Sequence, residues 1–395
     1  MAKVYVTGMG IITALGDTLE LNRDGLMQGK CAIGKLDSFP SKYAETLLFG
    51  EIKHSNAQLK KMLNVNVKGV SRTSLLALHA FNQAIQDAGI SEKELSNSDT
   101  SLVIANTVGG MCLTDELYQD ANQHNSGSEY IASYDCGSVG VFLQDRFKIR
   151  GIVNTINTAC SSSANAIMYG ARLIKKGYAK RVIVGGTDSL AKFTINGFNS
   201  LHILSPGLCA PFDKDRSGLN LGEGAAFLVL EGEDSIVDQK IIAEVKGYAN
   251  ANDAYHPSTL SENGDGPFLA MQQALKQAGL TPGDIDFINT HGTGTENNDE
   301  VEGRAMIRLF NKVPAFTSTK SNIGHTLGAS GAIEAVYCIL NLLHQEIYPS
   351  LNFKESITDT RLIPEQSYSK TVINNVMSNS FGFGGNCSSV ILSKV

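Results

Sequence analysis

The residues NTINTACSSSANAIMYGA, Asn154–Ala171, join an apolar run to a stretch of small side chains. The β-branched and apolar residues from Ile149 to Ile156 predict a buried strand. A polar turn with Cys160 follows, and apolar residues at helical spacing then continue to about Lys176. The stretch therefore predicts a strand, a sharp turn and a buried helix, with a thiol where the helix starts.

The thiol of Cys160 is the first candidate for chemistry. A helix N-terminus has unpaired N–H groups and the positive end of a dipole, so it favours a thiolate. Cysteines placed in this way have pKa values below that of a free thiol and act as nucleophiles. We therefore expect a depressed pKa for Cys160. The alternative is that Cys160 is only a small buried apolar residue, since free cysteine is often buried.

The composition indicates a globular chain with a large core. Of its 395 residues, 42% are hydrophobic and 18% are charged, and the length favours two or three domains. The net charge of −6 gives no electrostatic support for binding nucleic acid. The opening residues MAKVYVTGMG lack a signal-peptide pattern, and no apolar run approaches about 18 residues. We therefore expect no membrane segment.

The seven cysteines indicate reduced thiols. Their closest spacing is 24 residues (136 − 112), so the sequence has no CxxC pattern, and an odd number argues against a disulfide framework. This usage suggests a cytoplasmic protein. The sequence also lacks HExxH and HxH patterns, so we expect neither a metal site nor a cofactor.

The chain contains two copies of one unit. The second copy repeats four short sequence segments of the first in the same order. This argues for a duplicated β/α unit rather than a solenoid. Strands that alternate with helices predict sheets covered by helices. We place the join near Glu231–Gln239, which gives halves of residues 1–235 and 236–395. The matched pairs are Ala84–Ile90 with Ala274–Leu280, Asn106–Gly109 with Asn289–Gly292, Asn157–Ala164 with Asn322–Ala329, and Leu219–Glu231 with Asn379–Leu392.

Each copy carries an amphipathic helix before a buried strand. In the first copy the pattern predicts a helix over Ser71–Gly89, with Ser71 as its N-cap, and a strand within Thr100–Gly110. In the second copy it predicts a helix over Phe268–Gly279 and a strand at the start of Asp286–Gly294.

The register of the repeat aligns the candidate chemical side chains. Cys160 and His325, 165 residues apart (325 − 160), each open a helix of small residues, and His291 and Val108 each follow a strand. A pseudo-twofold axis would bring equivalent helix N-termini together. We therefore expect Cys160, His291 and His325 to share one site. Taken singly, each histidine could instead be a hydrogen-bonded core residue.

A cysteine with two histidines suits the formation of a carbon–carbon bond. One cysteine with one histidine would suggest a hydrolase-like pair. Here the thiol can hold an acyl group as a thioester, and two neutral imidazoles can stabilise a developing enolate oxygen. Lys320 would pair with a carboxylate and orient the histidines, with a solvated lysine as the alternative.

Four motifs resemble those of β-ketoacyl-acyl-carrier-protein synthases, most closely the elongating Cys-His-His class of type II systems. The resemblance extends from VTGMG at Val6–Gly10 to the C-terminus. It implies an α/β protein with the thiolase fold, in which duplicated halves form a five-layer αβαβα arrangement, and usually a dimer. The motifs are TACSSS at Thr158–Ser163, HGTGT with NDEVE at His291–Thr295 and Asn298–Glu302, TKSNIGHTLGASG at Thr319–Gly331, and NSFGFGG at Asn379–Gly385.

The resemblance implies a decarboxylative Claisen condensation in fatty-acid or polyene- and polyketide-type chain elongation. Its partners would be acyl-ACP and malonyl-ACP, where ACP is acyl carrier protein. Cys160 would accept the acyl chain while the backbone N–H groups of Cys160 and Phe383 bind the thioester oxyanion. Malonyl-ACP would then lose CO2, and His291 and His325 would stabilise the enolate that attacks the acyl group.

The same resemblance assigns supporting roles. Lys320 and Glu302 would form an ion pair with Asp299 nearby, although a first-turn Asp can simply interact with the helix dipole. The glycines around Phe381 and Phe383 would let that loop move as a gate. The acyl pocket would be lined by Val108, Phe198 and Tyr134, with plain core packing as the alternative for Val108 and Phe198.

Three stretches depart from the family pattern. The usual GFGGTN is GFGGNC here, at Gly382–Cys387, so the contacts of the usual Thr and Asn must differ. The segment Ile131–Val141 lacks the usual Pro and Phe residues, so Tyr134 and Asp135 are expected to reshape chain selection. The segment Gly185–Leu204 is similar to synthases of aryl-polyene pathways.

Two other functions fit the same fold. A non-catalytic partner subunit of the chain-length-factor type would shape the pocket of a heterodimer, but such subunits lack the cysteine. A thiolase would use a second cysteine near the C-terminus, where Cys387 lies, but His325 fits the ketosynthase pattern. We expect a homodimer, or a heterodimer with a second ketosynthase. Acidic carrier proteins favour a basic docking patch, for which the candidates are Lys60, Lys61, Lys68 and Arg72.

Overall fold

Two halves with the same strand order form the centre of the protein. The computed structural model describes residues 2–123, 125 and 127–395. Its main sheet has ten strands in the order β3-β2-β4-β5-β1-β6-β12-β11-β7-β8. These strands are β1 (Val4–Thr13), β2 (Thr100–Ala105), β3 (Val153–Ile156), β4 (Arg181–Asp188), β5 (Gly224–Gly232), β6 (Ala243–Asn252), β7 (Phe287–Asn289), β8 (Ala315–Thr317), β11 (Asn375–Gly382) and β12 (Asn386–Ser393).

The two halves have the same connectivity when each is read from its outer edge inward. The first half reads β3-β2-β4-β5-β1 and the second reads β8-β7-β11-β12-β6, so every strand has a counterpart. In both halves the three outer strands are parallel and the inner pairings are antiparallel. The halves meet where β1 and β6 pair antiparallel, at Tyr5–Glu244 and Val6–Ala243. This confirms the duplicated unit that the sequence repeat predicts.

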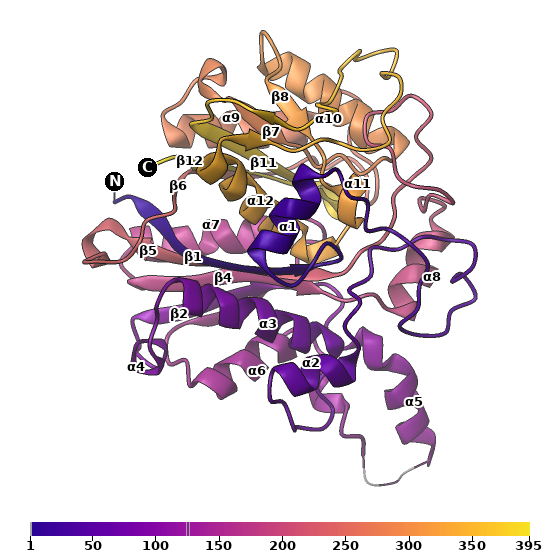
Figure 1. The fold of residues 1–395 in the computed structure, drawn as a ribbon, viewed down its shortest axis with the longest axis vertical. Helices are drawn as coiled ribbons and strands as arrows, with labels where there is room; N and C mark the ends of the chain where they lie inside the picture. The colour runs from indigo at the N-terminus through magenta and orange to yellow at the C-terminus, as the bar shows by residue number, and fades with distance from the viewer. Residues whose placement is uncertain (1, 124, 126) are drawn as a thin grey trace.

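Helices and half-sheets alternate in five layers (Figure 1). α7 and α12 lie between the half-sheets and share one buried apolar cluster with the facing sides of both. α3 and α6 cover the outer face of the first half, and α9 and α10 cover the outer face of the second. This is the αβαβα arrangement expected of the thiolase fold. The bounds are α3 (Arg72–Asp87), α6 (Ser138–Phe147), α7 (Ser162–Lys175), α9 (Asp265–Ala278), α10 (Glu296–Leu309) and α12 (Ser330–His344).

The central helix α12 is mostly apolar and is buried from Ser330 to Leu342. The segment Leu327–His344 contains it, and its 18 residues with a mean hydropathy of 1.3 are long and apolar enough to cross a membrane. However, 89% of the segment is buried inside the fold, as for a core helix of a globular protein. The segment is not a continuous apolar run, because Ser330, Glu334 and Asn341 interrupt it. The helix is apolar because it packs between two half-sheets.

The amphipathic helices predicted in the two copies are α3 and α9. Ser71 caps α3, and its hydroxyl accepts the backbone N–H of Ser74. α9 ends at Gly279, whose φ of 69° is the left-handed conformation that glycine adopts without strain. Both helices thus end where local sequence signals predict.

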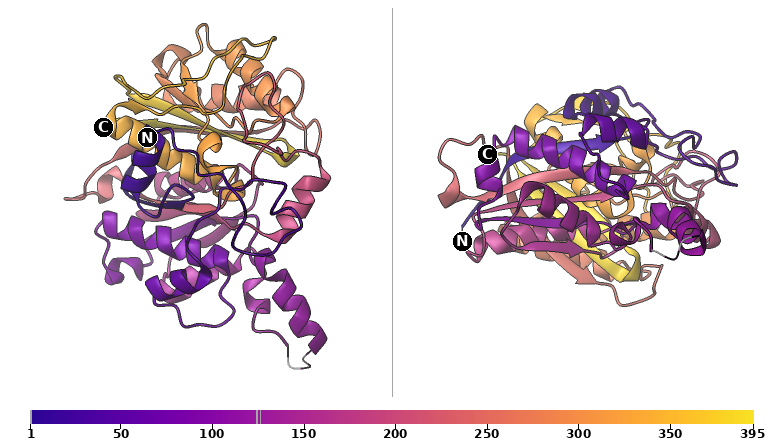
Figure 2. Two further views of the ribbon diagram at one scale, coloured as in Figure 1. Left: turned by 45° about the vertical axis from the view of Figure 1, so that its right-hand side comes forward. Right: turned by 90° about the horizontal axis from the view of Figure 1, so that it is seen from below.

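The remaining helices lie in the connections between strands. α5 stands away from the body of the molecule (Figure 2), and an ion pair between Asp115 and Lys192 joins it to α8. A small two-stranded sheet pairs β9 with β10. The bounds are α1 (Leu19–Met27), α2 (Asn56–Met62), α4 (Glu92–Leu95), α5 (Thr114–Gln123), α8 (Lys192–Ser200), α11 (Lys320–Ile323), β9 (Glu346–Ile347) and β10 (Ser369–Lys370), with the short 3₁₀ turns η1 (Met111–Leu113), η2 (Ile131–Ser133), η3 (Glu233–Ser235), η4 (Pro282–Asp284), η5 (Leu327–Ala329) and η6 (Phe383–Gly385).

Candidate active site

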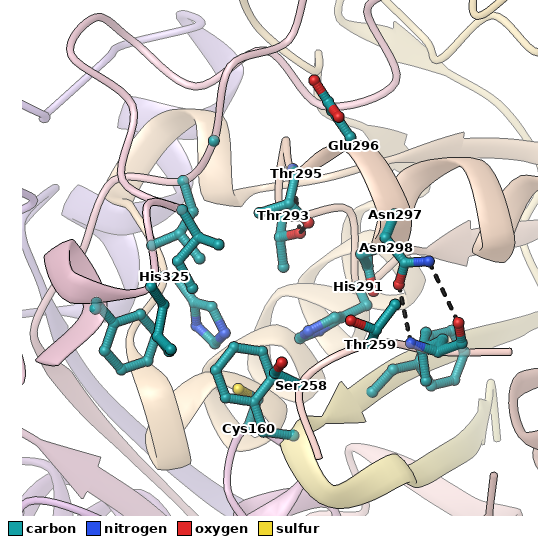
Figure 3. A pocket seen from close by; sticks show the side chains of 18 of the residues that line it. Cys160, Ser258, Thr259, His291, Thr293, Thr295, Glu296, Asn297, Asn298 and His325 are labelled. Carbon is teal, nitrogen blue, oxygen red and sulfur yellow. Dashed lines mark hydrogen bonds between the residues drawn. The ribbon is translucent and has the colours of Figure 1, made fainter. Parts of the chain in front are cut away.

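Three side chains from distant parts of the sequence meet in one cavity. The sulfur of Cys160 and one ring nitrogen each of His291 and His325 all lie within 4.8 Å of one another. All three residues are buried, and Figure 3 shows both imidazoles turned toward the thiol. The rings of His291 and His325 are nearly perpendicular, with centroids 5.4 Å apart. The geometry thus unites the three residues that the repeat predicted to share a site.

Two equivalent turns position the thiol and one imidazole. Cys160 lies in the turn between β3 and α7, residues 157–161, which we call the nucleophile turn. His325 lies in the turn before α12, at the equivalent position of the repeat. The residue before each has a positive φ, 53° at Ala159 and 77° at Gly324. The unusual backbone that presents Cys160 is therefore present in both copies.

Burial dominates the pKa of Cys160. Loss of solvent raises the pKa of this thiol to about 11, although the positive charge of Lys320 lowers it. Hydrogen bonds from the backbone N–H groups of Phe383 and of Cys160 itself also lower the pKa. The depressed pKa expected from the helix N-terminus is therefore wrong, because burial outweighs the favourable dipole and charge. The resting side chain is a neutral thiol with two N–H donors beside it.

His325 is held in one tautomer. Its Nδ1 accepts the backbone N–H of Leu327 at 3.1 Å, and the hydroxyl of Ser330 lies 3.0 Å from the same nitrogen. Burial and the charge of Lys320 lower the pKa of His325 well below its ordinary value, so the ring is neutral. A neutral ring that accepts at Nδ1 carries its proton on Nε2. That Nε2 is buried without a partner among the described residues, so it is a free donor in the site.

His291 is fixed by its backbone rather than by its ring. Its backbone N–H and that of Gly292 donate to the two oxygens of Glu302, each at 2.9 Å. Burial, the charge of Lys320 and the neighbouring His325 lower the pKa of His291, so this ring is also neutral. Its Nδ1 is buried without a described partner. The contacts therefore leave its tautomer open, in contrast to that of His325.

Lys320 forms a buried ion pair with Glu334 of α12. Both side chains are almost completely buried. The pairing of Lys320 with Glu302 implied by the family resemblance is wrong for this structure. Glu302 instead accepts the two backbone N–H groups of the His291 loop and the side-chain amide of Asn379. Burial raises the pKa of Glu334, and likewise that of Glu302, to about 7.

Asp299, three residues before Glu302 in the first turn of α10, supports the same loop. Its carboxylate accepts the backbone N–H of Gly294 at 3.1 Å and that of Phe212 at 2.8 Å. Asp299 is completely buried, and burial raises its pKa. Its role here is to hold the backbone that carries His291, which is more than a favourable contact with the helix dipole.

The cavity in front of these side chains has a volume of about 550 Å³. Phe198 of α8 and Phe383 lie at its wall, and their rings are stacked with centroids 5.9 Å apart. Val108 and Tyr134 are absent from the lining: Val108 is buried in a neighbouring apolar cluster, and Tyr134 lies near Thr114. The other lining residues include Ser258, Thr259, Thr293, Thr295, Glu296, Asn297 and Asn298, which give the outer part a polar wall (Figure 3).

The loop between β11 and β12, residues 383–385, forms one side of the cavity, and we call it the gate loop. Gly384 and Gly385 have φ angles of 78° and 74°, which favour glycine. The gate loop is tied to the segment after β6, since Gly384 donates to the carbonyl of Pro257 at 2.7 Å. Phe381, at the end of β11, is buried 5.9 Å from the ring of His291. A movement of this loop would therefore move Phe383 relative to Cys160.

The spacing of Cys160, His291 and His325 would also suit a metal ion. A histidine ligand needs a lone pair on the coordinating nitrogen. Binding at Nε2 of His325 would move its proton to Nδ1, which would then face the N–H of Leu327. The donor set therefore fits an acid–base and hydrogen-bonding role better than a metal centre.

Three polar residues of the site were missed in the sequence. Glu334 pairs with Lys320, Ser330 touches His325, and Asp188 accepts the backbone N–H groups of Thr107, Val108 and Gly328. Glu334 stands alone within the apolar run GAIEAVYCIL, and such a lone charge was a usable signal.

Arg72 does not belong to a basic docking patch. It is buried, and its guanidinium donates to both carboxylate oxygens of Glu223. Of the other three candidates, Lys61 and Lys68 are exposed and Lys60 is half-buried.

Comparisons with known proteins agree with the fold and the site. Residues 1–235 match the family described as beta-ketoacyl synthase, N-terminal domain, and residues 242–354 match beta-ketoacyl synthase, C-terminal domain. A curated relative is the 3-oxoacyl-[acyl-carrier-protein] synthase 2 of Synechocystis sp. It is 33% identical over 400 residues, which cover 97% of this chain and 96% of that protein.

Solved structures show the same similarity. The ishigamide ketosynthase/chain length factor has a TM-score of 0.93 at 28% identity, with 100% of this chain and 99% of that chain covered. A ketosynthase from Xenorhabdus doucetiae, solved in complex with its chain length factor, has a TM-score of 0.89 at 32% identity. That match covers 100% of this chain and 98% of the other.

Proposed function

This chain belongs to the β-ketoacyl synthase family, and from that premise we propose which of its residues carry out the family's reaction. The protein is an acyltransferase, a condensing enzyme of the 3-oxoacyl-ACP synthase type that elongates acyl chains carried by ACP. The assignment of residues rests on one observation, the meeting of Cys160, His291 and His325 within 4.8 Å in a cavity.

In the first step Cys160 accepts the acyl group. Its sulfur forms a bond to the thioester carbon of acyl-ACP, and the bond from that carbon to the carrier's sulfur breaks. The proton of Cys160 passes by way of His291, whose tautomer is open, to the departing carrier thiol. The N–H groups of Phe383 and Cys160 stabilise the oxyanion that forms on the carbonyl.

In the second step malonyl-ACP loses CO2 and attacks. Its thioester oxygen becomes an enolate oxygen, and Nε2–H of His325 is a donor already aimed into that space. His291 supplies a second donor when its proton is on the nitrogen facing the site. The enolate carbon bonds to the acyl carbon on Cys160, which leaves as a thiolate and regains its proton, releasing 3-oxoacyl-ACP.

Two alternative functions have less support. A chain-length-factor-type subunit does not need the thiol, the two neutral imidazoles or the buried Lys320–Glu334 pair, and this chain has all of them. A thiolase would need a second cysteine facing the substrate. Cys387 is completely buried, and it is not among the residues that line the cavity.

The assembly, location and pathway are further proposals. We propose a dimer, either of two identical chains or with a chain length factor, because two ketosynthases of similar structure are named together with such a partner. We also propose a cytoplasmic location, which the seven free cysteines support. The similarity of Gly185–Leu204 to aryl-polyene synthases supports a pathway of that type.

Acyl transfer and decarboxylation with purified ACP test the function. Incubation with acyl-ACP should add the acyl mass to Cys160 and to no other cysteine. Incubation with malonyl-ACP should release CO2, and Cys160→Gln, which imitates the acylated side chain, should release it faster. A protein that condenses acetyl-CoA without releasing CO2 would be a thiolase instead. A protein that acquires no acyl mass from any acyl-ACP would be a partner subunit.

A further inference from the structure

Amide and hydroxyl side chains connect the nucleophile turn to the start of β12. The Oδ1 atom of Asn386 accepts three hydrogen bonds, from the hydroxyl of Ser161 at 2.9 Å and the side-chain amides of Asn165 and Asn250 at 2.9 and 2.6 Å. Ser161 directly follows Cys160, and Asn386 directly follows the gate loop. The bond between Ser161 and Asn386 spans 225 residues and joins the two halves of the chain.

The nucleophile turn is bound to this cluster at further points. The amide of Asn165 also donates to the hydroxyl of Thr158 at 2.7 Å. The hydroxyl of Ser161 lies 2.8 Å from the carbonyl of Thr158, so its single proton is shared between that oxygen and Oδ1 of Asn386. On the other side, the hydroxyl of Ser388 and the amide of Asn250 lie 3.0 and 3.2 Å from Oδ1 of Asn165. With three donors on one oxygen, the carboxamide of Asn386 has little freedom to rotate.

The two N–H groups beside the thiol need such a link because they belong to different halves. One comes from Cys160 in the nucleophile turn and the other from Phe383 in the gate loop. The gate loop itself contains two glycines with positive φ, so its own backbone constrains it weakly. Ser161 and Asn386 lie one and three residues from these donors, which places their hydrogen bond where it can fix the spacing.

We propose that Asn386 is a positioning residue that fixes the spacing of the two oxyanion-binding N–H groups for the transfer of the acyl group to Cys160. This rests on the proposed function. At Asn386 the chain departs from the GFGGTN pattern of the family that it resembles. Among the described residues Asn386 makes no hydrogen bond to the imidazoles or to Lys320, and the acylation step should therefore depend on it more than decarboxylation does.

The test measures the two half-reactions separately. The rate at which Cys160 gains acyl mass from acyl-ACP should fall about tenfold to a hundredfold in Asn386→Ala, because small misplacements of oxyanion donors are costly. Release of CO2 from malonyl-ACP, measured in a Cys160→Ala background with and without Asn386→Ala, should change less than about twofold. An equal fall in both rates would indicate general damage to the site and overturn the proposal.

Further variants separate a specific link from a loss of folding. Asn386→Thr keeps an acceptor oxygen and should acylate faster than Asn386→Ala; an equally slow Asn386→Thr would overturn the role of the acceptor. Asn375→Ala removes a hydrogen-bonded amide at the far end of the same hairpin and should acylate like the wild type. If Asn386→Ala does not fold, Ser161→Ala removes the same bond from the other side and should show the same selective loss.

The outcomes also distinguish this proposal from the proposed function. A wild-type protein that gains no acyl mass from acyl-ACP contradicts the function. A wild-type protein that is acylated at the same rate as Asn386→Ala leaves the function intact and overturns the inference alone.

Discussion

The backbone N–H of Leu327 donates to Nδ1 of His325, and this single hydrogen bond decides what the other side of the ring can do. Because Nδ1 is occupied as an acceptor, the neutral imidazole has its proton on Nε2, which faces the cavity. Leu327 holds a positive φ of 52° at this point. The site therefore contains a fixed hydrogen-bond donor before any substrate arrives.

The donor of His325 predicts different effects for two substitutions. His325→Ala should slow the release of CO2 from malonyl-ACP by about 10²–10³-fold, the usual cost of a lost oxyanion donor. His325→Gln, whose amide can place an N–H near the same point, should keep part of that rate. Radiolabelled malonyl-ACP measures both, and equal rates for the two variants would contradict the role of the Nε2 proton.

The raised pKa of Cys160 predicts slow alkylation near neutral pH. A thiol with a pKa of about 11 is ionised to about one part in a thousand at pH 8. Its reaction with iodoacetamide should therefore rise about tenfold for each pH unit until about pH 11. Peptide mass spectrometry at Cys160 measures the rate, with Cys160→Ser as the control for the labelled peptide.

Lys320→Met should slow that alkylation further, because it removes the positive charge that lowers the pKa of Cys160. A reaction that is already at its plateau near pH 8 in the wild type would show that burial does not control this thiol.

The ion pair between Lys320 and Glu334 predicts a large loss of stability when one partner is removed. Lys320→Met leaves the buried Glu334 carboxylate without its partner and should cost about 3–5 kcal/mol in the free energy of unfolding. Lys320→Met combined with Glu334→Met should recover much of this loss. Urea unfolding measures both variants.

An exposed ion pair provides the matched control for Lys320. Lys214 pairs with Glu355 at the surface, where both side chains remain exposed. Lys214→Met should therefore cost less than about 1 kcal/mol. A loss as small as this for Lys320→Met would mean that the buried pair does not contribute to the stability of the core.

The stacked rings of Phe198 and Phe383 predict control over which acyl chains are accepted. Such a pair contributes about 0.5–1.5 kcal/mol, which favours the position that the gate loop has in this structure. Phe198→Ala should increase the rate of acylation by long acyl-ACPs about twofold to tenfold relative to short ones. The adduct mass on Cys160 across a panel of chain lengths measures this preference.

Phe193 offers a control on the same helix. It is 59% exposed and lies outside the cavity lining. Phe193→Ala should leave the chain-length profile unchanged. An unchanged profile for Phe198→Ala as well would show that the stacked pair does not limit entry.

Most of the fold could be predicted because the two halves of the sequence repeat the same pattern of strands, turns and helices. Four sequence segments recur in the same order, and the ten-stranded sheet has the same strand order in both halves. The same register paired Cys160 with His325, and these two residues do meet. Local rules also sufficed for helix ends such as Ser71 and Gly279, because caps depend on neighbouring residues.

The ion-pair partners and the pKa of the nucleophile could not be predicted, because they depend on contacts between residues far apart in the sequence. Lys320 lies 14 residues before Glu334 and 18 residues after Glu302, so sequence distance did not decide between them. The sequence favours a surface position for Arg72, but its buried partner Glu223 is 151 residues away. The raised pKa of Cys160 has no local signal, because the burial of this thiol depends on the assembled layers.

The two equivalent turns before α7 and α12 carry different side chains, so the two halves take different chemical roles. If both copies had kept the same side chain at that position, the centre would contain either two nucleophiles or two donors, and neither combination completes the reaction. Because both copies lie in one polypeptide, the residue at this position can change in one copy while the equivalent residue in the other copy stays the same. The asymmetry needed for a two-stage synthesis thus follows from covalent linkage of two near-identical folds.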